Sequence, residues 1–333
     1  MGPMSDQTVR TLVVTAHGGP EVLEVRRVPR PEPGPGQLLV QVAASGINFI
    51  EVYRRKGIYA GEPPFALGTE CAGTVVEVGA GVTDFSPGDV VATESGIGVH
   101  AELALVEAGR AVAVPAGVSP ETAAATMLQG ITVQYLVTST FAVQPGQDVL
   151  VHAAAGGVGQ LLVQWVSSLG ARVIATVGSA EKAGIATARG ADAVLRYDQV
   201  HGDDLVAAIR AAAASGGVHV AYDGVGASTF DVSLGSLHPR GTLVLYGASS
   251  GPVPPFDLQR LNTGGSLYVT RPTLGHYVPT TRELRERAAD VLGRVATGEL
   301  EISIGGRYRL DDAAQAYRDL EARRTTGKLL LVP

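Results

Sequence analysis

A loop rich in glycine is the segment of this sequence whose residue types most clearly indicate chemistry. It reads Ala-Ala-Ala-Gly-Gly-Val-Gly over residues 153–159, between an apolar run and a predicted helix. Glycines let the backbone turn sharply and approach a pyrophosphate, and the helix N-terminus offers unpaired N–H groups. The loop predicts a dinucleotide site with Gly156, Gly157 and Val158 at the cofactor. Ala154 replaces the first glycine of the usual pattern, and a tight turn without a ligand is the alternative.

The kind of dinucleotide is indicated by the residues that follow the next predicted strand. An NAD site usually carries Asp or Glu there to bind the ribose 2′-hydroxyl. This chain has Gly178 and Ser179 instead, and Gly178 leaves room for a 2′-phosphate. Lys182 lies one helical step further, where its point charge suits phosphate, and Tyr197 ends the next strand. The pattern predicts NADPH; Glu181 is a rival acidic candidate, and an ordinary exposed lysine is the alternative for Lys182.

The elements that must position these residues alternate between helix and strand. Such alternation is typical of βαβ units and a parallel sheet. The predicted helices are 121–140, 157–169, 180–189, 203–213 and 230–237, and the predicted strands are 148–152, 171–177, 193–197, 218–223 and 241–246.

The regions on either side have a different pattern. Many short strands punctuated by Gly and Pro come first, and they suggest a barrel-like fold. Two helices and a closing strand come last, so the α/β part is inserted between a β-rich part and a segment that completes it. The early strands are 9–15, 23–28, 38–44, 73–78 and 90–93, the late helices are 282–297 and one from Asp311 or Asp312 to about Arg324, and the closing strand is 328–332.

The composition excludes several classes of protein. The 333 residues are 45% hydrophobic and 17% charged, as in a folded chain rather than a disordered one. The net charge of −6 argues against a basic nucleic-acid-binding domain or a polybasic membrane patch. The single cysteine, Cys71, excludes an intrachain disulfide and Cys-rich zinc sites. Without a signal peptide or a long apolar run, we expect a cytoplasmic protein.

The order of these parts resembles the medium-chain dehydrogenase/reductase superfamily and, more narrowly, its zinc-free quinone oxidoreductase branch, which includes the zeta-crystallins. The motifs that carry the resemblance are Gly-Gly-Pro-Glu-Val-Leu at 18–23, Gly-Ile-Asn-Phe-Ile at 46–50, Gly-Thr-Glu at 68–70, the run 152–159 and Tyr-Val-Thr-Arg-Pro at 268–272. The resemblance implies an α/β fold with an active site in a cleft between two domains. These are a GroES-like β-rich catalytic domain, residues 1–127 and 271–333, and a Rossmann NADPH-binding domain with a doubly wound parallel sheet, residues 128–270.

The resemblance also implies a site without a metal. Zinc alcohol dehydrogenases of this superfamily carry a Cys and a His-Glu pair where this chain has Asn48 and Thr69-Glu70, and neither Asn nor Thr is a good zinc ligand. Without a Lewis acid, drawing a proton from an alcohol at neutral pH is difficult, so reduction is favoured. We expect hydride transfer from NADPH to an acceptor that is already electrophilic.

Further site residues follow from the resemblance. Asn48 is expected to bind the nicotinamide ribose or the substrate oxygen, and Tyr53 and Tyr59 to bound a flat pocket. The alternative is that Asn48 is a turn residue and that both tyrosines pack. His100 is a weaker candidate to line the cleft. The remaining residues expected to bind the cofactor are Gln129, Thr132, Tyr246, Gly247, Ser249, Ser250, Arg271 and Lys328.

The β-prone segment 266–270 predicts a homodimer, since in the family such edge strands pair across a two-fold axis. The leading function is NADPH-dependent reduction of a quinone. The enzyme alternative is reduction of an enone, enal or enoyl thioester on the same scaffold. The non-enzyme alternative is a structural or RNA-binding protein that binds NADPH, although the negative charge counts against RNA.

Overall fold

The computed structural model describes residues 8–333, and the chain divides into two compact units. The first unit comprises residues up to Ile131 together with Thr280–Pro333, and the second is Thr132–Pro279. The boundaries expected from the sequence lie after residues 127 and 270, and the first seven residues of the expected catalytic domain are outside the described part. Each unit has its own sheets, so each is considered separately below.

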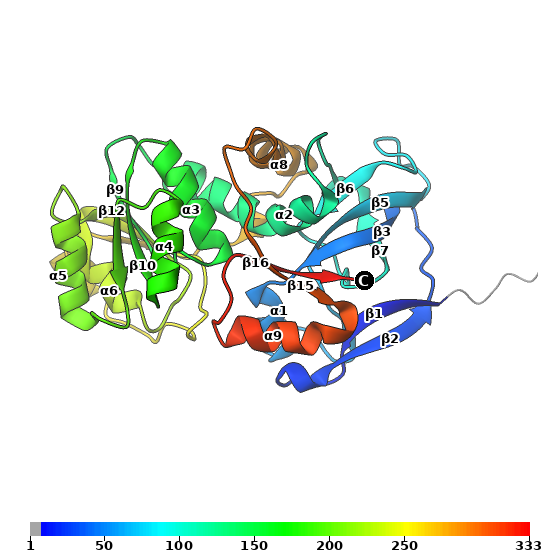
Figure 1. Cartoon of the computed structure of the whole chain (residues 1–333), viewed down its shortest axis with the longest axis horizontal. Coiled ribbons are helices and arrows are strands. Elements are labelled where there is room, and N and C mark those ends of the chain that lie inside the picture. The colour runs from blue at the N-terminus through cyan, green and yellow to red at the C-terminus, as the bar shows by residue number, and fades with distance from the viewer. Residues whose placement is uncertain (1–7) are drawn as a thin grey trace, which may run out of the picture. The chain divides into compact units, whose positions relative to one another are not determined.

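The second unit is built on a parallel sheet. Its strand order is β11-β10-β9-β12-β13-β14, and every neighbouring pair is parallel. Helices α3 and α4 cover one face and α5 and α6 the other (Figure 1). The direction of winding reverses between β9 and β12, which is where such sheets bind ligands at the carboxyl ends of their strands. The doubly wound Rossmann sheet predicted from the sequence is confirmed.

These elements follow the hydrophobic pattern of the sequence. Val149, Leu150 and Val151 of β9 are all buried, as expected for a strand covered on both faces. The strands are β9 (Asp148–Val151), β10 (Arg172–Val177), β11 (Ala193–Arg196), β12 (Val218–Asp223), β13 (Leu237–Leu245) and β14 (Tyr268–Thr270), and the helices are α3 (Gly157–Ser168), α4 (Ala180–Ala188), α5 (Gly202–Ala212), α6 (Phe230–Gly235), α7 (Gln259–Thr263) and the 3-10 turn η4 (Leu274–His276).

The first unit is β-rich. Its larger sheet has the order β15-β16-β3-β5-β6-β8 with β7 also paired to β3, and a smaller sheet has the order β2-β1-β4. The strands are β1 (Thr8–Val14), β2 (Leu23–Pro29), β3 (Gln37–Gly46), β4 (Phe65–Ala66), β5 (Glu70–Val78), β6 (Val90–Thr93), β7 (Leu103–Glu107), β8 (Val112–Ala113), β15 (Ile304–Arg309) and β16 (Lys328–Val332). The GroES-like β-rich unit predicted from the sequence is confirmed.

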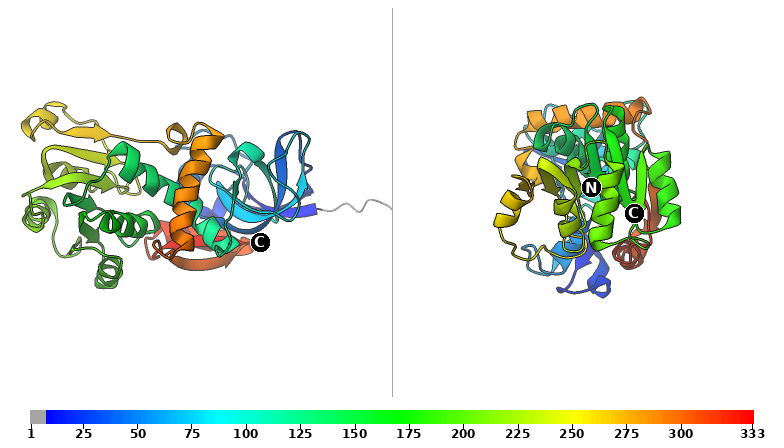
Figure 2. Two further views of the ribbon diagram at one scale, coloured as in Figure 1. Left: turned by 90° about the horizontal axis from the view of Figure 1, so that it is seen from above. Right: turned by 90° about the vertical axis from the view of Figure 1, so that its left-hand side faces the viewer.

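Helices and turns of the first unit come from both ends of the chain. They are α1 (Phe49–Arg55), the first part of α2 (Pro120–Tyr135), α8 (Thr281–Ala296), α9 (Ala313–Glu321) and the 3-10 turns η1 (Pro20–Val22), η2 (Ala108–Arg110) and η5 (Leu310–Asp312). Helix α8, orange in Figure 2, packs on α2 through Gly130, where a Cβ would lie 2.5 Å from Val291 Cγ1. Strand β16 pairs with β3, Leu331 opposite Ser45. The C-terminal segment therefore completes the unit that the N-terminal segment begins.

The structure differs from the sequence predictions at a few element ends. The helix predicted to run to Thr140 is α-helical to Tyr135 and then forms a π turn, η3 (Leu136–Thr140), beside which the buried Tyr222 hydroxyl donates to two carbonyls. Helix α6 ends at Gly235 rather than at Leu237, and β13 begins at Leu237 rather than at Gly241. Its register with β12 shifts between the pairs Val218–Leu237 and Val220–Thr242, and Arg240 between them adopts φ +65°.

Candidate active site

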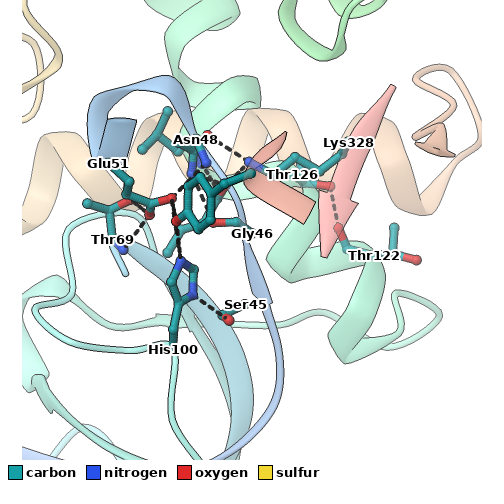
Figure 3. A network of polar contacts seen from close by, with 12 residues as sticks. Ser45, Gly46, Asn48, Glu51, Thr69, His100, Thr122, Thr126 and Lys328 are labelled. Atoms are coloured by element: carbon teal, nitrogen blue, oxygen red, sulfur yellow. Dashed lines mark hydrogen bonds and ion pairs between the residues drawn. The ribbon is translucent and has the colours of Figure 1, made fainter. Parts of the chain in front are cut away.

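Asn48 lies at the centre of a buried polar cluster in the first unit (Figure 3). It is the residue before α1 and is 5% exposed. Its Nδ2 donates to Gly46 O at 3.1 Å and to Glu70 Oε1 at 2.7 Å, and its Oδ1 accepts from Lys328 Nζ at 2.7 Å. The ammonium can only donate and the carboxylate only accepts, so the orientation of the amide is fixed. Both amide hydrogens are used, and Asn48 can therefore meet a ligand only as an acceptor.

Glu70 and Lys328 form the charged part of this cluster. Both side chains are buried, and Lys328 Nζ donates to Glu70 Oε1. The other carboxylate oxygen, Oε2, accepts from the Leu128 backbone N–H at 2.7 Å, which ties the cluster to α2. Lys328, expected from the resemblance to bind the cofactor, thus has its Nζ engaged by Glu70 and Asn48. It supplies a positive charge at the position next to Asn48.

A second buried carboxylate, Glu51, adjoins the first cluster. Its Oε1 accepts from the backbone N–H of Thr69 at 3.0 Å and from the Thr69 hydroxyl at 2.7 Å. Its Oε2 accepts from the backbone N–H of Asn48 at 2.8 Å and from the Tyr317 hydroxyl at 2.7 Å. The imidazole of His100 lies 3.4 Å from Oε2 and also contacts Ser45 Oγ at 2.7 Å (Figure 3). His100 is therefore a member of this buried network, fully shielded from solvent.

The environment of Glu51 sets its pKa. Burial raises the pKa, but His100 and the hydroxyl and imidazole hydrogen bonds outweigh burial and lower it from 4.5 to about 2. A carboxylate whose pKa is lower in the folded state contributes stability above its unfolded pKa, and this contribution is lost as the pH falls through the folded pKa. We expect Glu51→Gln to cost on the order of 3 kcal/mol of unfolding free energy at neutral pH, and the cost to shrink between pH 4.5 and 2. Urea unfolding of both proteins at several pH values measures this; a cost independent of pH would contradict it.

Tyr53 and Tyr59 are brought together by the end of α1. Their rings meet edge to face, with centroids 5.5 Å apart, and the Tyr59 N–H lies 3.3 Å from the Tyr53 carbonyl. Tyr59 is 41% exposed and its neighbour Ile58 is 61% exposed. The pair thus forms a partly exposed aromatic surface that begins in α1 and follows Asn48 in the chain. In α2, Gln129 is half-buried and follows Leu128, while Thr132 is buried and hydrogen-bonds Tyr135.

In the second unit, the glycine loop joins β9 to the N-terminus of α3. Gly156 is the N-cap residue of α3, and no side chain caps this end of the helix. The backbone N–H groups of Gly157 and Val158, in the first turn, therefore have no partner within the helix. The close packing needs Gly159, because a Cβ there would lie 2.3 Å from the Ala153 carbonyl oxygen. Ala153 adopts φ +50°, in the left-handed region. The loop has the geometry of an anion-binding helix N-terminus.

The tight fit at Gly159 gives a testable prediction. Gly159→Ala should lower the free energy of unfolding by about 1–3 kcal/mol, the usual cost of overpacking, and weaken binding of NADPH. Gly184→Ala is the matched control, because a Cβ at Gly184, within α4, meets nothing within 4 Å and should be neutral or stabilising. Urea unfolding and NADPH fluorescence titration measure both effects. Equal behaviour of the two variants would contradict the packing role.

The end of β10 is open in the way that the sequence predicted. A Cβ at Gly178 would meet no atom within 4 Å. Ser179 caps α4, its Oγ accepting the Lys182 N–H at 3.3 Å, and Lys182 is half-exposed in the first turn. Helix α4 therefore starts directly beside the free space at Gly178.

Tyr197 connects the ends of three strands. Its hydroxyl lies 2.6 Å from Thr176 Oγ1, 3.0 Å from His152 Nδ1 and 3.2 Å from the Ala153 N–H. The ring stacks on His152, at an interplanar angle of 16°. Burial lowers the pKa of His152, whose side chain is fully buried. The structure therefore brings Tyr197 to the glycine loop.

The loop after β12 is held by a residue that sequence analysis missed, Asp223. Its carboxylate, at the end of β12, accepts from the N–H groups of Val225 and Gly226 and from two hydroxyls. The loops after β12 and β13 are joined by backbone bonds from Tyr246, Gly247, Ser249 and Ser250. Arg271 donates to the carbonyls of Leu245 and Gly247, 3.2 and 3.3 Å away. The residues expected at this strand end are thus gathered in one place.

Comparison with known proteins gives the class. Residues 34–116 match the alcohol dehydrogenase GroES-like domain, and residues 157–291 match the zinc-binding dehydrogenase family. A quinone oxidoreductase of Pseudomonas aeruginosa is 43% identical over 96% of this chain and 98% of its own length. A 2-haloacrylate reductase of Burkholderia is 37% identical over 98% of this chain and 99% of its own length. A mycobacterial protein solved in complex with NADPH is 46% identical and has a TM-score of 0.94; the match covers 98% of this chain and 100% of that one.

Fold, glycine loop and relatives together define a medium-chain dehydrogenase/reductase. Within that superfamily the chain belongs to the quinone oxidoreductase family. Among residues 8–333 no three His, Cys, Asp or Glu side chains are placed to hold a metal ion, and no helix of that range is long and apolar enough to cross a membrane.

Proposed function

We propose that this protein transfers hydride from NADPH to a quinone without a metal ion. It is an NADPH-dependent oxidoreductase, and the observation that carries the choice of nucleotide is the open end of β10, with free space at Gly178 and no carboxylate at the strand tip. The quinone is supported by the relatives of that name, one of them 43% identical over nearly the whole chain.

Residues of the second unit fit NADPH. Gly157 and Val158 offer backbone N–H groups to the pyrophosphate, while Gly156, whose own N–H donates to the Ala153 carbonyl at 2.9 Å, lets the backbone approach it. Gly178, Ser179, Lys182 and Tyr197 receive the 2′-phosphate. Tyr246, Gly247, Ser249 and Arg271 serve the nicotinamide half, together with Gln129 and Thr132. When bound, NADPH supplies the hydride.

In the first unit, we propose that Asn48 accepts a hydrogen bond from a ribose hydroxyl. A substrate carbonyl would need a hydrogen-bond donor, and both amide hydrogens of Asn48 are already donated within the cluster. A ribose hydroxyl can instead donate to the amide oxygen. Tyr53 and Tyr59 offer a flat aromatic surface and hydroxyl donors to the acceptor. Lys328 keeps Asn48 oriented rather than binding the cofactor directly.

Metal independence is supported by the same cluster. A divalent ion held by Glu70 would face the ammonium of Lys328, and like charges at this range repel strongly inside a protein. Asn48 and Thr69 also have their side chains engaged by other groups.

The test is NADPH oxidation by the purified protein, in a chelator, with benzoquinones, ortho-quinones and enals, and with NADH in parallel. Turnover of quinones that is insensitive to chelator and much slower with NADH is expected. Turnover of enals alone would favour the second candidate, an activated-alkene reductase, which the similarity to a 2-haloacrylate reductase supports. Loss of activity in chelator would overturn metal independence, and tight NADPH binding without turnover would favour a non-enzymatic role.

We further propose a cytoplasmic homodimer that forms through β14. This strand ends the sheet, pairing with β13 on one side. Tyr268 on it is 61% exposed. An edge strand offers N–H and C=O groups to a second chain. Light scattering should give twice the mass of the chain, and a proline at Val269 should shift the protein towards monomer.

A further inference from the structure

Glu51 is a buried charge that the proposed function does not use. Its side chain is fully shielded and belongs to α1, the helix that starts beside Asn48. An isolated buried carboxylate is costly, so what its hydrogen bonds hold in place is of interest.

The bonds of Glu51 join separate segments of the chain. One oxygen holds the backbone N–H of Asn48, and the other holds the backbone N–H and hydroxyl of Thr69. The Gly96 N–H holds the Thr69 carbonyl at 2.7 Å, so the Thr69 segment is fixed from both sides. Tyr317, from α9, closes the set. A single carboxylate thus sets the distance between the start of α1 and the start of β5.

Glu51 and Glu70 hold Asn48 in different ways. Glu51 fixes its backbone, whereas Glu70 and Lys328 fix its side chain. Glu51 therefore acts on the place of the residue in the backbone, and Glu70 and Lys328 act on the orientation of its amide. The titratable and charged groups around Glu51 are the imidazole of His100, Arg55 and Glu321 beyond Tyr317, and Glu70 with Lys328 beyond Asn48.

We propose that Glu51 is a positioning residue of the reductase, whose carboxylate places Asn48 for contact with the ligand. The inference deepens the proposed function and rests on it, because it requires Asn48 to contact cofactor or substrate. Displacing a contact residue by about 1 Å costs on the order of 10²-fold in rate. A purely structural Glu51 would instead lower stability and leave the activity of the folded fraction unchanged.

A double-mutant cycle separates these roles. Glu51→Gln and Asn48→Ala are made singly and together, and kcat and KM are measured on protein shown to be folded by circular dichroism. Each single variant is expected to lose roughly 10- to 100-fold in kcat/KM, and both losses should arise in the same one of the two constants, kcat or KM. The double variant is expected to lose no more than the more damaged single variant. Tyr317→Phe removes one donor to Glu51 and is expected to give a smaller loss that is also non-additive with Asn48→Ala; it carries the test if Glu51→Gln does not fold.

Glu321→Gln is the matched control. It breaks the ion pairs with Arg55 and Lys56 but touches neither Asn48 nor Thr69, so kcat/KM should stay near that of the wild type. Losses of Glu51→Gln and Asn48→Ala that multiply, or an unchanged kcat/KM in folded Glu51→Gln, would overturn the inference and leave the proposed function intact. A wild type that reduces no acceptor would overturn the function as well, whereas a silent Asn48→Ala would overturn the role of Asn48 and with it the inference.

Discussion

Replacing Gly178 by Asp is expected to turn the preference of the protein from NADPH towards NADH. The new carboxylate would stand at the end of β10, in space where a Cβ meets no atom within 4 Å. There it would repel a 2′-phosphate and could accept a hydrogen bond from a 2′-hydroxyl. Apposed like charges cost several kcal/mol, so the ratio of kcat/KM for NADPH to that for NADH should fall roughly 10²- to 10³-fold.

Steady-state kinetics with both nucleotides and one quinone measure this ratio. Gly184→Asp is the matched control, because it adds the same charge to the exposed part of α4 where a Cβ also has free space. It should leave the ratio nearly unchanged. A similar drop in both variants would mean that net charge, rather than the position of Gly178, governs the choice, and no drop in either would place the 2′-phosphate elsewhere.

Lys328→Met should be among the most destabilising substitutions in the first unit. It removes the cation from a buried pair and leaves Glu70 charged and shielded from water. Removing one partner of a buried pair typically costs 3–5 kcal/mol, of which much reflects the uncompensated charge, so we expect a loss of about that size. Urea unfolding measures it.

The uncompensated charge can be tested directly. In the double variant Lys328→Met with Glu70→Gln, the charge is gone, and most of the lost stability should return. An exposed pair gives the baseline: Arg260→Ala, which breaks the contact with Asp231, should cost only about 0–1 kcal/mol. A double variant that is no more stable than Lys328→Met would contradict this explanation. The loss would then come from the packing of the lysine side chain rather than from the uncompensated charge of Glu70.

The Rossmann unit could be predicted almost completely because its signals are local. A buried strand such as β9, the glycine loop and an apolar helix follow one another along the chain, and each narrows the interpretation of the next. The open end of β10 at Gly178 could be predicted for the same reason, since the absence of an acidic residue there is visible in the sequence.

The buried cluster of the first unit could not be predicted from local pattern. Lys328 and Glu70 are 258 positions apart, and nothing near either residue indicates the other. The resemblance assigns Lys328 to the cofactor, whereas the structure engages its Nζ with Glu70 and Asn48. Helix α1 was missed because it has only seven residues. One local signal was present: Asn48 and Glu51 have the spacing of a helix N-cap and its third residue, which indicates that the glutamate turns back to the cap.

The interrupted course of the first unit has a consequence for how the chain folds during synthesis. The second unit is one continuous stretch, so it can fold while later residues are still being made. The β-rich unit cannot be finished at that time, because β16 and α9, which bring Lys328 and Tyr317 to the early carboxylates, emerge last. Until then Glu51 lacks the Tyr317 hydroxyl and Glu70 lacks the Lys328 ammonium, although the donors from Asn48, Thr69 and Leu128 are already made. A chain that ends shortly before residue 328 would therefore carry the whole second unit but a first unit that lacks β16 and the cation for Glu70.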